Sequence, residues 1–139
     1  MEKKGETMIT RYFTIKEANE LLPTIIKEIN ELKMLQQDFE SKLKKLERVK
    51  HSMQLEVRND TDSLFKMESE IEFIEMQVQL HVNNVQLTGA QLKGIETALV
   101  DFPAIHNDEE ILLCWKEGES HIAYYHSLQD GYSGRKPLE

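Results

Sequence analysis

Apolar residues recur at every seventh position through the first third of the chain, and this spacing constrains the fold more than any other feature. Unbroken heptads predict a long amphipathic helix that packs along a partner helix. Thr14 and Glu17 have the spacing of a capping box, and Phe13 can pack against Ala18, so we expect the helix to begin there and to run about 40 residues, roughly 60 Å. The heptad series is Ala18, Ile25, Leu32, Phe39, Leu46 and Met53.

A second heptad series predicts a second helix that folds back on the first. Turn-forming residues interrupt the pattern at positions 57–61, and Gly89 is a natural helix end because glycine takes the left-handed conformation at little cost. The series is Leu64, Ile71, Val78 and Val85, with Met67, Ile74 and His81 in the companion position.

Antiparallel pairing of the two helices gives a specific register. It sets Leu46 beside Ile71 and brings Gln36 and His81 into one polar layer. It also places the basic segment 42–50 opposite acidic residues of the second helix, which favours a neutralised helix face over a nucleic-acid patch.

After Gly89 the apolar period changes from 3.5 to 2, which predicts strands. Residues 98–105 form one expected strand, with Pro103 indicating a sheet edge. Residues 111–116 and 121–126 flank a turn at 117–120 and predict a hairpin. The expected fold is therefore α+β and mainly α: a long antiparallel, coiled-coil-like helical hairpin followed by a small three-stranded antiparallel β-unit.

One domain over residues 11–139 is expected, because the chain has 139 residues and room for one modest core. It divides into the helical hairpin at 11–89, the β-unit at 90–128 and a C-terminal tail at 129–139. Residues 1–10 are polar and expected to be a disordered N-terminal tail.

The register of the expected hairpin decides which polar residues meet. With Lys116 opposite His121, Cys114 and His126 fall on opposite faces of the sheet. Asp101 joins Cys114 if the first strand pairs with the second. This register predicts neither a metal site nor a cofactor, and Cys114, next to Trp115, is interpreted as a small buried hydrophobe rather than a nucleophile.

Motifs at both ends of the chain resemble those of a known family. They are the stretch from Arg11 to Pro23 at one end and, at the other, Leu99–Ala104, Leu113–Trp115, Gly118–Glu119, Tyr125–His126 and Gly131–Arg135. Together they resemble the bacterial domain of unknown function numbered 2203. The resemblance implies no activity, only that the polar residues of the C-terminal third belong to one motif set. Two departures are visible: Tyr125 stands where the family often has Trp, and Ala98 where Gly is more usual.

Composition excludes several function classes. The formal net charge of -8 argues against general binding to nucleic acid or to anionic membranes. No apolar run approaches the roughly 20 residues that span a bilayer, and the first residues lack the apolar core of a signal peptide. A single cysteine indicates a reducing compartment, so we expect a cytoplasmic protein.

Candidate site residues gather at the β-end. Asp101, Glu119, His126 and Arg135 are the predicted ligand-binding residues, with Arg135 suited to a carboxylate or phosphate. The alternative for Arg135 is an ion pair with Asp101 or Glu119 that pins the tail to the sheet.

Two hypotheses for function follow. The first is a non-enzymatic assembly or adaptor protein, homodimeric through the helices, that binds a protein or small anionic partner. The alternative is a metal- or anionic-ligand-dependent enzyme with its site at the β-end. The dimer follows from apolar residues outside the helical seam: Ile26, Met34, Leu35, Leu55, Phe65, Phe73, Met76 and Leu80.

Overall fold

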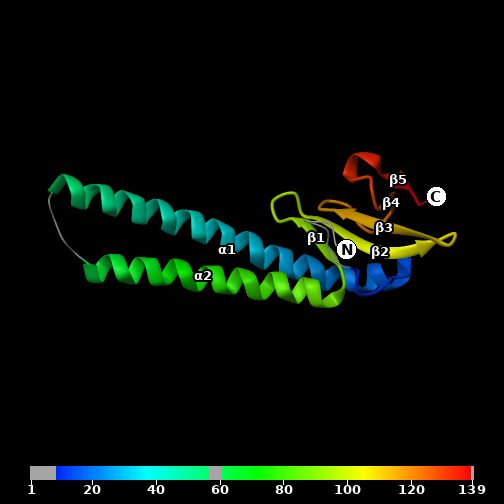
Figure 1. Cartoon of the computed structure of the whole chain (residues 1–139), viewed down its shortest axis with the longest axis horizontal. Helices are drawn as coiled ribbons and strands as arrows, with labels where there is room; N and C mark the ends of the chain where they lie inside the picture. The colour runs from blue at the N-terminus through cyan, green and yellow to red at the C-terminus, as the bar shows by residue number, and fades with distance from the viewer. Residues whose placement is uncertain (1–8, 57–60, 139) are drawn as a thin grey trace, which may run out of the picture.

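A computed structural model describes residues 9–56 and 61–138. Two helices form an antiparallel hairpin, and a sheet lies against the end of the hairpin where the first helix begins and the second ends (Figure 1). The elements are α1 (Ile15–Glu56), α2 (Thr61–Thr88), β1 (Gln91–Gly94), β2 (Leu99–His106), β3 (Glu109–Lys116), β4 (Tyr124–Ser127), the short 3-10 helix η1 (Tyr132–Gly134) and β5 (Lys136–Pro137). No helix in these residues is long and apolar enough to cross a membrane. The expected N-terminal tail lies outside the described residues, apart from Ile9 and Thr10.

The start of α1 is the predicted capping box. The Thr14 amide donates to Glu17 Oε1 at 2.9 Å, and the Glu17 amide donates to Thr14 Oγ1 at 3.0 Å. These two bonds hold the pKa of the Glu17 carboxyl below its usual value. Phe13 and Ala18 are both buried, as the staple predicts.

The predicted apolar positions face the partner helix in α1, and in α2 Ile71, Ile74 and Val85 are buried while Leu64, Met67 and Val78 are half-buried. Every member of the α1 heptad series is buried except Phe39, which is half-buried. Lys42 pairs with Glu70 at 3.3 Å, so part of the basic cluster is neutralised across the seam. In place of the expected polar layer of Gln36 with His81, each of the two side chains has a carboxylate partner.

The two polar side chains have other partners. His81 contacts Glu28 through Nδ1, and Gln36 donates to Glu96 at 3.4 Å. Hydrogen bonds to an ionised carboxylate are stronger than hydrogen bonds between neutral groups, so Glu28 and Glu96 are better partners than a neutral side chain. The expected turn at 57–61 lies almost entirely outside the described residues.

The sheet has five strands in the order β1-β2-β3-β4-β5, all pairs antiparallel. The prediction of three strands is therefore wrong. Both extra strands are short and come from segments with weak apolar alternation: β1 lies in what was expected to be the helix exit, and β5 in the expected irregular tail. Each forms because a neighbouring strand presents free backbone groups that need partners.

Pro103 lies where β2 is locally an edge. The pairing of β1 with β2 ends at Asp101, so the β1 side of β2 is open at Pro103. The Pro103 carbonyl accepts instead from the Phe13 amide at 2.7 Å. The proline, which has no N–H to donate, thus occupies a position where the ladder does not need one.

One face of the sheet packs on the helices and forms the core. Phe102 and Leu113 pair across β2 and β3 as predicted, and both are buried with Ile25 of α1. Phe13 packs edge-on against Phe102, with ring centroids 5.4 Å apart. The core cluster consists of Phe13, Ala18, Leu22, Ile25, Ile29, Val85, Ala90, Ala98, Val100, Phe102, Ala104, Ile111, Leu113, Trp115 and Ile122.

The register of β3 with β4 corrects the sequence-based one by a single residue. Leu112 pairs with His126 and Cys114 with Tyr124. The expected strand at 121–126 does not begin until Tyr124, because the Ile122 amide donates to Asn19 Oδ1 at 2.8 Å and the Ile122 side chain is buried in the helical core. This contact with α1 lengthens the loop and shifts every β4 side chain to the other face.

Candidate metal centre

The sheet face that points away from the helical core carries buried polar residues. Directly paired residues of an antiparallel sheet share a face, and the pairs Gln91 with Asp101, Asp101 with Cys114 and Cys114 with Tyr124 form one row across four strands. His126 pairs with Leu112 on the same face, one step along. Among the described residues, Gln91, Asp101 and His126 make up the buried polar and charged set.

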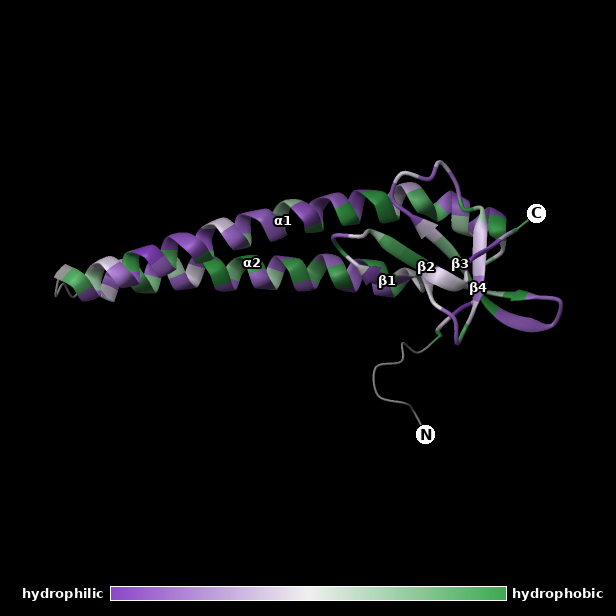
Figure 2. Ribbon diagram, turned by 90° about the horizontal axis from the view of Figure 1, so that it is seen from above, coloured by the Kyte–Doolittle hydropathy of each residue, from purple (hydrophilic) through white to green (hydrophobic). Residues whose placement is uncertain are grey.

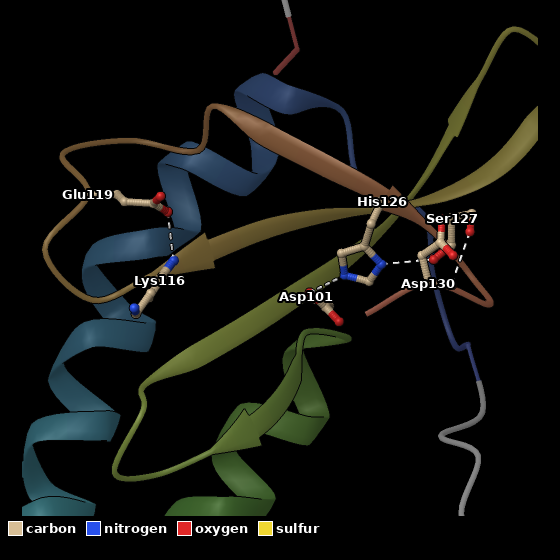
Figure 3. A network of polar contacts seen from close by, with 6 residues as sticks. All are labelled: Asp101, Lys116, Glu119, His126, Ser127 and Asp130. Carbon is tan, nitrogen blue, oxygen red and sulfur yellow. Dashed lines mark hydrogen bonds and ion pairs between the residues drawn. The ribbon is translucent and has the colours of Figure 1, made fainter. Parts of the chain in front are cut away.

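His126 and Asp101 point toward each other across β3, as Figure 3 shows. His126 Nε2 lies 3.1 Å from Asp101 Oδ1, and both side chains are almost completely buried, at 3% and 4% exposed. The other ring nitrogen, Nδ1, lies 2.8 Å from the Ser127 carbonyl oxygen.

This geometry fixes what must lie between His126 and Asp101. A carbonyl oxygen only accepts, so Nδ1 carries a proton. In the neutral ring Nε2 would then present a lone pair to a carboxylate oxygen, which is repulsive. A proton shared between the two groups removes this repulsion, whether it is on Nε2 or on the carboxyl, and a metal ion bound by both would do the same.

Cys114 completes a set of three ligand types. The sulfur of Cys114, a carboxylate oxygen of Asp101 and an imidazole nitrogen of His126 all lie within 4.8 Å of one another. Burial raises the pKa of the Cys114 thiol to about 12, the Asp101 carboxylate adds to the rise, and Arg135 opposes it. The free thiol is therefore protonated at neutral pH, and Cys114 does not have the thiolate that a nucleophile needs.

Glu119 and Arg135 form a second pair near this cluster. Arg135 Nη2 donates to Glu119 Oε2, and the guanidinium lies over the Tyr124 ring, 4.0 Å from its centroid. Glu119 Oε1 accepts from the Lys116 amide at 2.8 Å, and the Glu119 carbonyl accepts from Trp115 Nε1 at 2.9 Å. Glu119 thus joins the β3–β4 loop to the tail.

The four predicted site residues therefore form two pairs. Asp101 bonds His126, and Glu119 bonds Arg135, which is the alternative in which Arg135 pins the tail. Cys114 lies between the pairs, since it pairs with Asp101 on one side and, on the other, with Tyr124, whose ring lies under the Arg135 guanidinium. Asp101 and Cys114 are buried, and Tyr125 packs against the core cluster.

Cys114 is the functional candidate that sequence reasoning missed. The interpretation of Cys114 as an inert residue depended on a register that put it and His126 on opposite faces of the sheet. The one-residue shift puts both on the same face. The signal was present in the motif set, where Cys114 and His126 accompany Asp101 and Arg135. The register of β3 with β4 depends on the contact between Asn19 and Ile122, and no local sequence pattern predicts that contact.

Fold and site define a class of protein in which a long helical hairpin carries a small antiparallel sheet. The outer face of this sheet holds a buried Asp, Cys and His. The chain belongs to the family of uncharacterized conserved proteins DUF2203, whose model matches residues 11–138. No curated protein and no solved structure matches the chain.

Proposed function

We propose that this protein binds a divalent transition-metal ion through Asp101, Cys114 and His126, and that Zn²⁺ is the ion of best fit. The observation that carries the proposal is the convergence of three different ligand types within 4.8 Å in a buried site. Thiolate, imidazole and carboxylate are the ligands that Zn²⁺ takes in proteins.

Distances support this assignment. With zinc–ligand bonds of about 2.0–2.3 Å, the donors of a tetrahedral site lie roughly 3.3–3.8 Å apart. The His126–Asp101 contact of 3.1 Å is already at that scale, so a small inward rotation of Cys114 would close the set. His126 Nδ1 donates to the Ser127 carbonyl oxygen. Metal-binding histidines are commonly oriented by such a hydrogen bond from the ring nitrogen that does not bind the metal.

Charge balance favours a divalent ion over a larger or smaller charge. A carboxylate, a thiol and an imidazolium sum to zero. A carboxylate, a thiolate, a neutral imidazole and a divalent ion also sum to zero. Replacing two protons by one M²⁺ therefore adds no net charge to a buried site, where an uncompensated charge would be expensive.

The competing interpretation is a purely structural cluster, in which an imidazolium–carboxylate pair is buried beside an inert thiol. That arrangement accounts for the His126–Asp101 contact and gives Cys114 no role. The metal site accounts for all three residues.

Three protein ligands leave one tetrahedral position for water or a small ligand, the arrangement of catalytic rather than structural zinc sites. Arg135 stacks on Tyr124, the pairing neighbour of Cys114, so Arg135 and its partner Glu119 lie near the three ligands. A metal-dependent enzyme acting on a small anionic substrate is the form of the proposal that uses all four predicted residues. A reducing compartment keeps a lone cysteine available as a metal ligand, and we propose a cytoplasmic location.

Metal content tests the proposal directly. Protein prepared without an affinity tag, stripped with chelator and reloaded, is expected to hold one Zn²⁺ per chain by elemental analysis. Co²⁺ in place of Zn²⁺ is expected to show a thiolate-to-metal charge-transfer band, because Cys114 is a ligand. Cys114→Ser, Asp101→Asn and His126→Gln are each expected to weaken binding by more than about tenfold.

Glu119→Gln is the matched control, since Glu119 lies near Cys114 without being a ligand, and its metal content should stay close to that of the wild type. Wild-type protein that binds no transition metal under these conditions refutes the proposal. So does a Cys114→Ser variant that binds Co²⁺ with the wild-type spectrum.

A second candidate function has its own observation. The outer face of α2 carries exposed apolar side chains, which favours an assembly or adaptor protein that associates through its helices in a coiled-coil-like manner. The two functions are compatible, because the metal cluster lies on the sheet and the exposed apolar face lies on the hairpin.

A further inference from the structure

The helix α2 is apolar on two opposite faces. Ile71, Ile74 and Val85 are buried in the hairpin. On the far side, five apolar residues are 57% to 85% exposed: Phe65, Phe73, Met76, Leu80 and Leu87. At 3.6 residues per turn these five fall within an arc of about 80°, centred roughly 160–180° from the buried set. We call them the outer stripe.

The outer stripe follows one face of α2, with Ser69 and Asn83 between its apolar residues. It spans 23 residues along α2, from Phe65 to Leu87, or roughly 33 Å. Figure 2 shows hydrophobic residues along the whole of α2, interleaved with hydrophilic ones. A helix that is apolar on both sides is normally buried on both sides. By contrast, the exposed Met34 and Leu55 of α1 are isolated from each other, which is usual for single surface residues.

Three of the five stripe residues are symmetric about Met76, and Phe73 and Leu80 stand three and four positions from it on either side. Met76 stands eleven positions from both Phe65 and Leu87, and Ser69 and Asn83 stand seven positions on either side of it on the same face. An antiparallel copy of α2 therefore sets Met76 against itself, Phe65 against Leu87 and Ser69 against Asn83. A two-fold interface requires such self-complementarity.

Charge gives the same orientation. The first half of α2 carries five carboxylates, and residues 76–88 contain no Asp, Glu, Lys or Arg. Parallel pairing would set the acidic halves side by side, whereas antiparallel pairing sets each against the uncharged half of the other copy. The carboxylates are Asp62, Glu68, Glu70, Glu72 and Glu75.

We infer that the outer stripe of α2 is a homodimer interface, in which a second copy of this chain packs antiparallel across a two-fold axis near Met76. The two hairpins then form a four-helix layer with α2 of each copy inside and α1 outside. The metal clusters lie at opposite ends of the assembly, so dimer formation and metal binding are independent.

Sedimentation equilibrium tests the interface. Wild-type protein is expected to be a dimer at about 10 µM, and Leu80→Glu, which buries a carboxylate in each copy, is expected to weaken association by more than about 100-fold. Leu55→Glu is the matched control, since it makes the same change at an exposed leucine outside the stripe, and it should remain dimeric. Circular dichroism checks that each variant keeps its helices.

A wild-type monomer at about 100 µM overturns the inference, since a stable interface of this length should be populated there. An unchanged dimer for Leu80→Glu overturns it as well, because the contact would then lie elsewhere.

Thiol crosslinking tests the orientation separately. Phe65→Cys and Leu87→Cys proteins, mixed and treated with a short bifunctional thiol reagent, are expected to form a mixed dimer. Neither variant should crosslink with itself, because antiparallel pairing separates like positions by roughly 33 Å. The native Cys114 is fully buried and does not compete. Efficient crosslinking of Phe65→Cys to itself would show parallel pairing and overturn the antiparallel arrangement.

Discussion

At the scale of single residues, Arg135 connects the tail to the sheet. Its side chain is only 9% exposed. Its guanidinium lies over Tyr124 and Tyr132, and it pairs with Glu119. Its Nε is buried without a hydrogen-bond partner among the described residues. A planar, permanently charged group is needed to stack and donate at the same time.

Arg135→Ala is expected to lower the free energy of unfolding by about 1–3 kcal/mol, because it leaves Glu119 without its cationic partner and removes two ring contacts. Arg135→Lys should recover only part of this loss, since an ammonium group cannot stack as a plane. Urea denaturation measures both. Lys136→Ala, an exposed neighbour, should change stability by less than about 0.5 kcal/mol; equal losses at both positions would mean that Arg135 has no special role.

The sequence predicted Asp101, Glu119, His126 and Arg135 as site residues, and these occupy one end of the molecule in two bonded pairs. It could do so because their residue types and motif context are local properties. The sequence could not place Cys114 on the same face as His126. The face that a strand residue occupies depends on the strand register, and this register depends on a contact with α1.

At the scale of elements, two left-handed residues shape the path from α2 into the sheet. Gly89 ends α2 with φ 95°, and a Cβ there would lie 2.5 Å from Arg11 Cγ. Ala98, the last residue of the turn before β2, has φ 47°. The turn before β2 thus forms with alanine at a position where glycine is more usual. The left-handed conformation costs more free energy for alanine than for glycine.

Gly89→Ala is expected to destabilise the protein by about 1–3 kcal/mol, because the added Cβ meets both an unfavourable φ and the Arg11 side chain. Gly131→Ala is the control: φ there is -104° and a Cβ would meet nothing within 4 Å. Thermal unfolding compares the two. A Gly89→Ala variant as stable as Gly131→Ala would show that the helix end tolerates a different backbone path.

At the scale of the whole molecule, the core is concentrated at one end. The central cluster has no member between Ile29 and Val85 among the described residues. Far from the sheet, α1 is held only by its contact with α2, whereas near the sheet it packs against both α2 and the strands. The hairpin therefore projects from a stable base (Figure 1).

This arrangement predicts a gradient in hydrogen exchange along α1. Amides around Leu22–Ile29 are expected to be protected close to the global free energy of unfolding, and those around Leu46–Met53 to exchange by local opening at lower cost. Native-state exchange monitored by NMR measures the gradient, with the Leu80→Glu variant as the monomeric reference. Uniform protection along α1 would show that the hairpin and the base unfold as one unit.

The sequence by itself determined the helices, their antiparallel pairing, the capping box at Thr14, the end of α2 at Gly89 and the pairing of Asp101 with Cys114. These follow from the heptad period, from capping chemistry and from short connections, all of which act between near neighbours in the chain. Tertiary structure decided the rest. The segments β1 and β5 form strands because they pair with free edges of the neighbouring strands. The register of β4 is shifted by one residue because Ile122 packs against α1. Because side chains alternate in a strand, that single step brought His126 to the face of Cys114 and created the candidate metal centre.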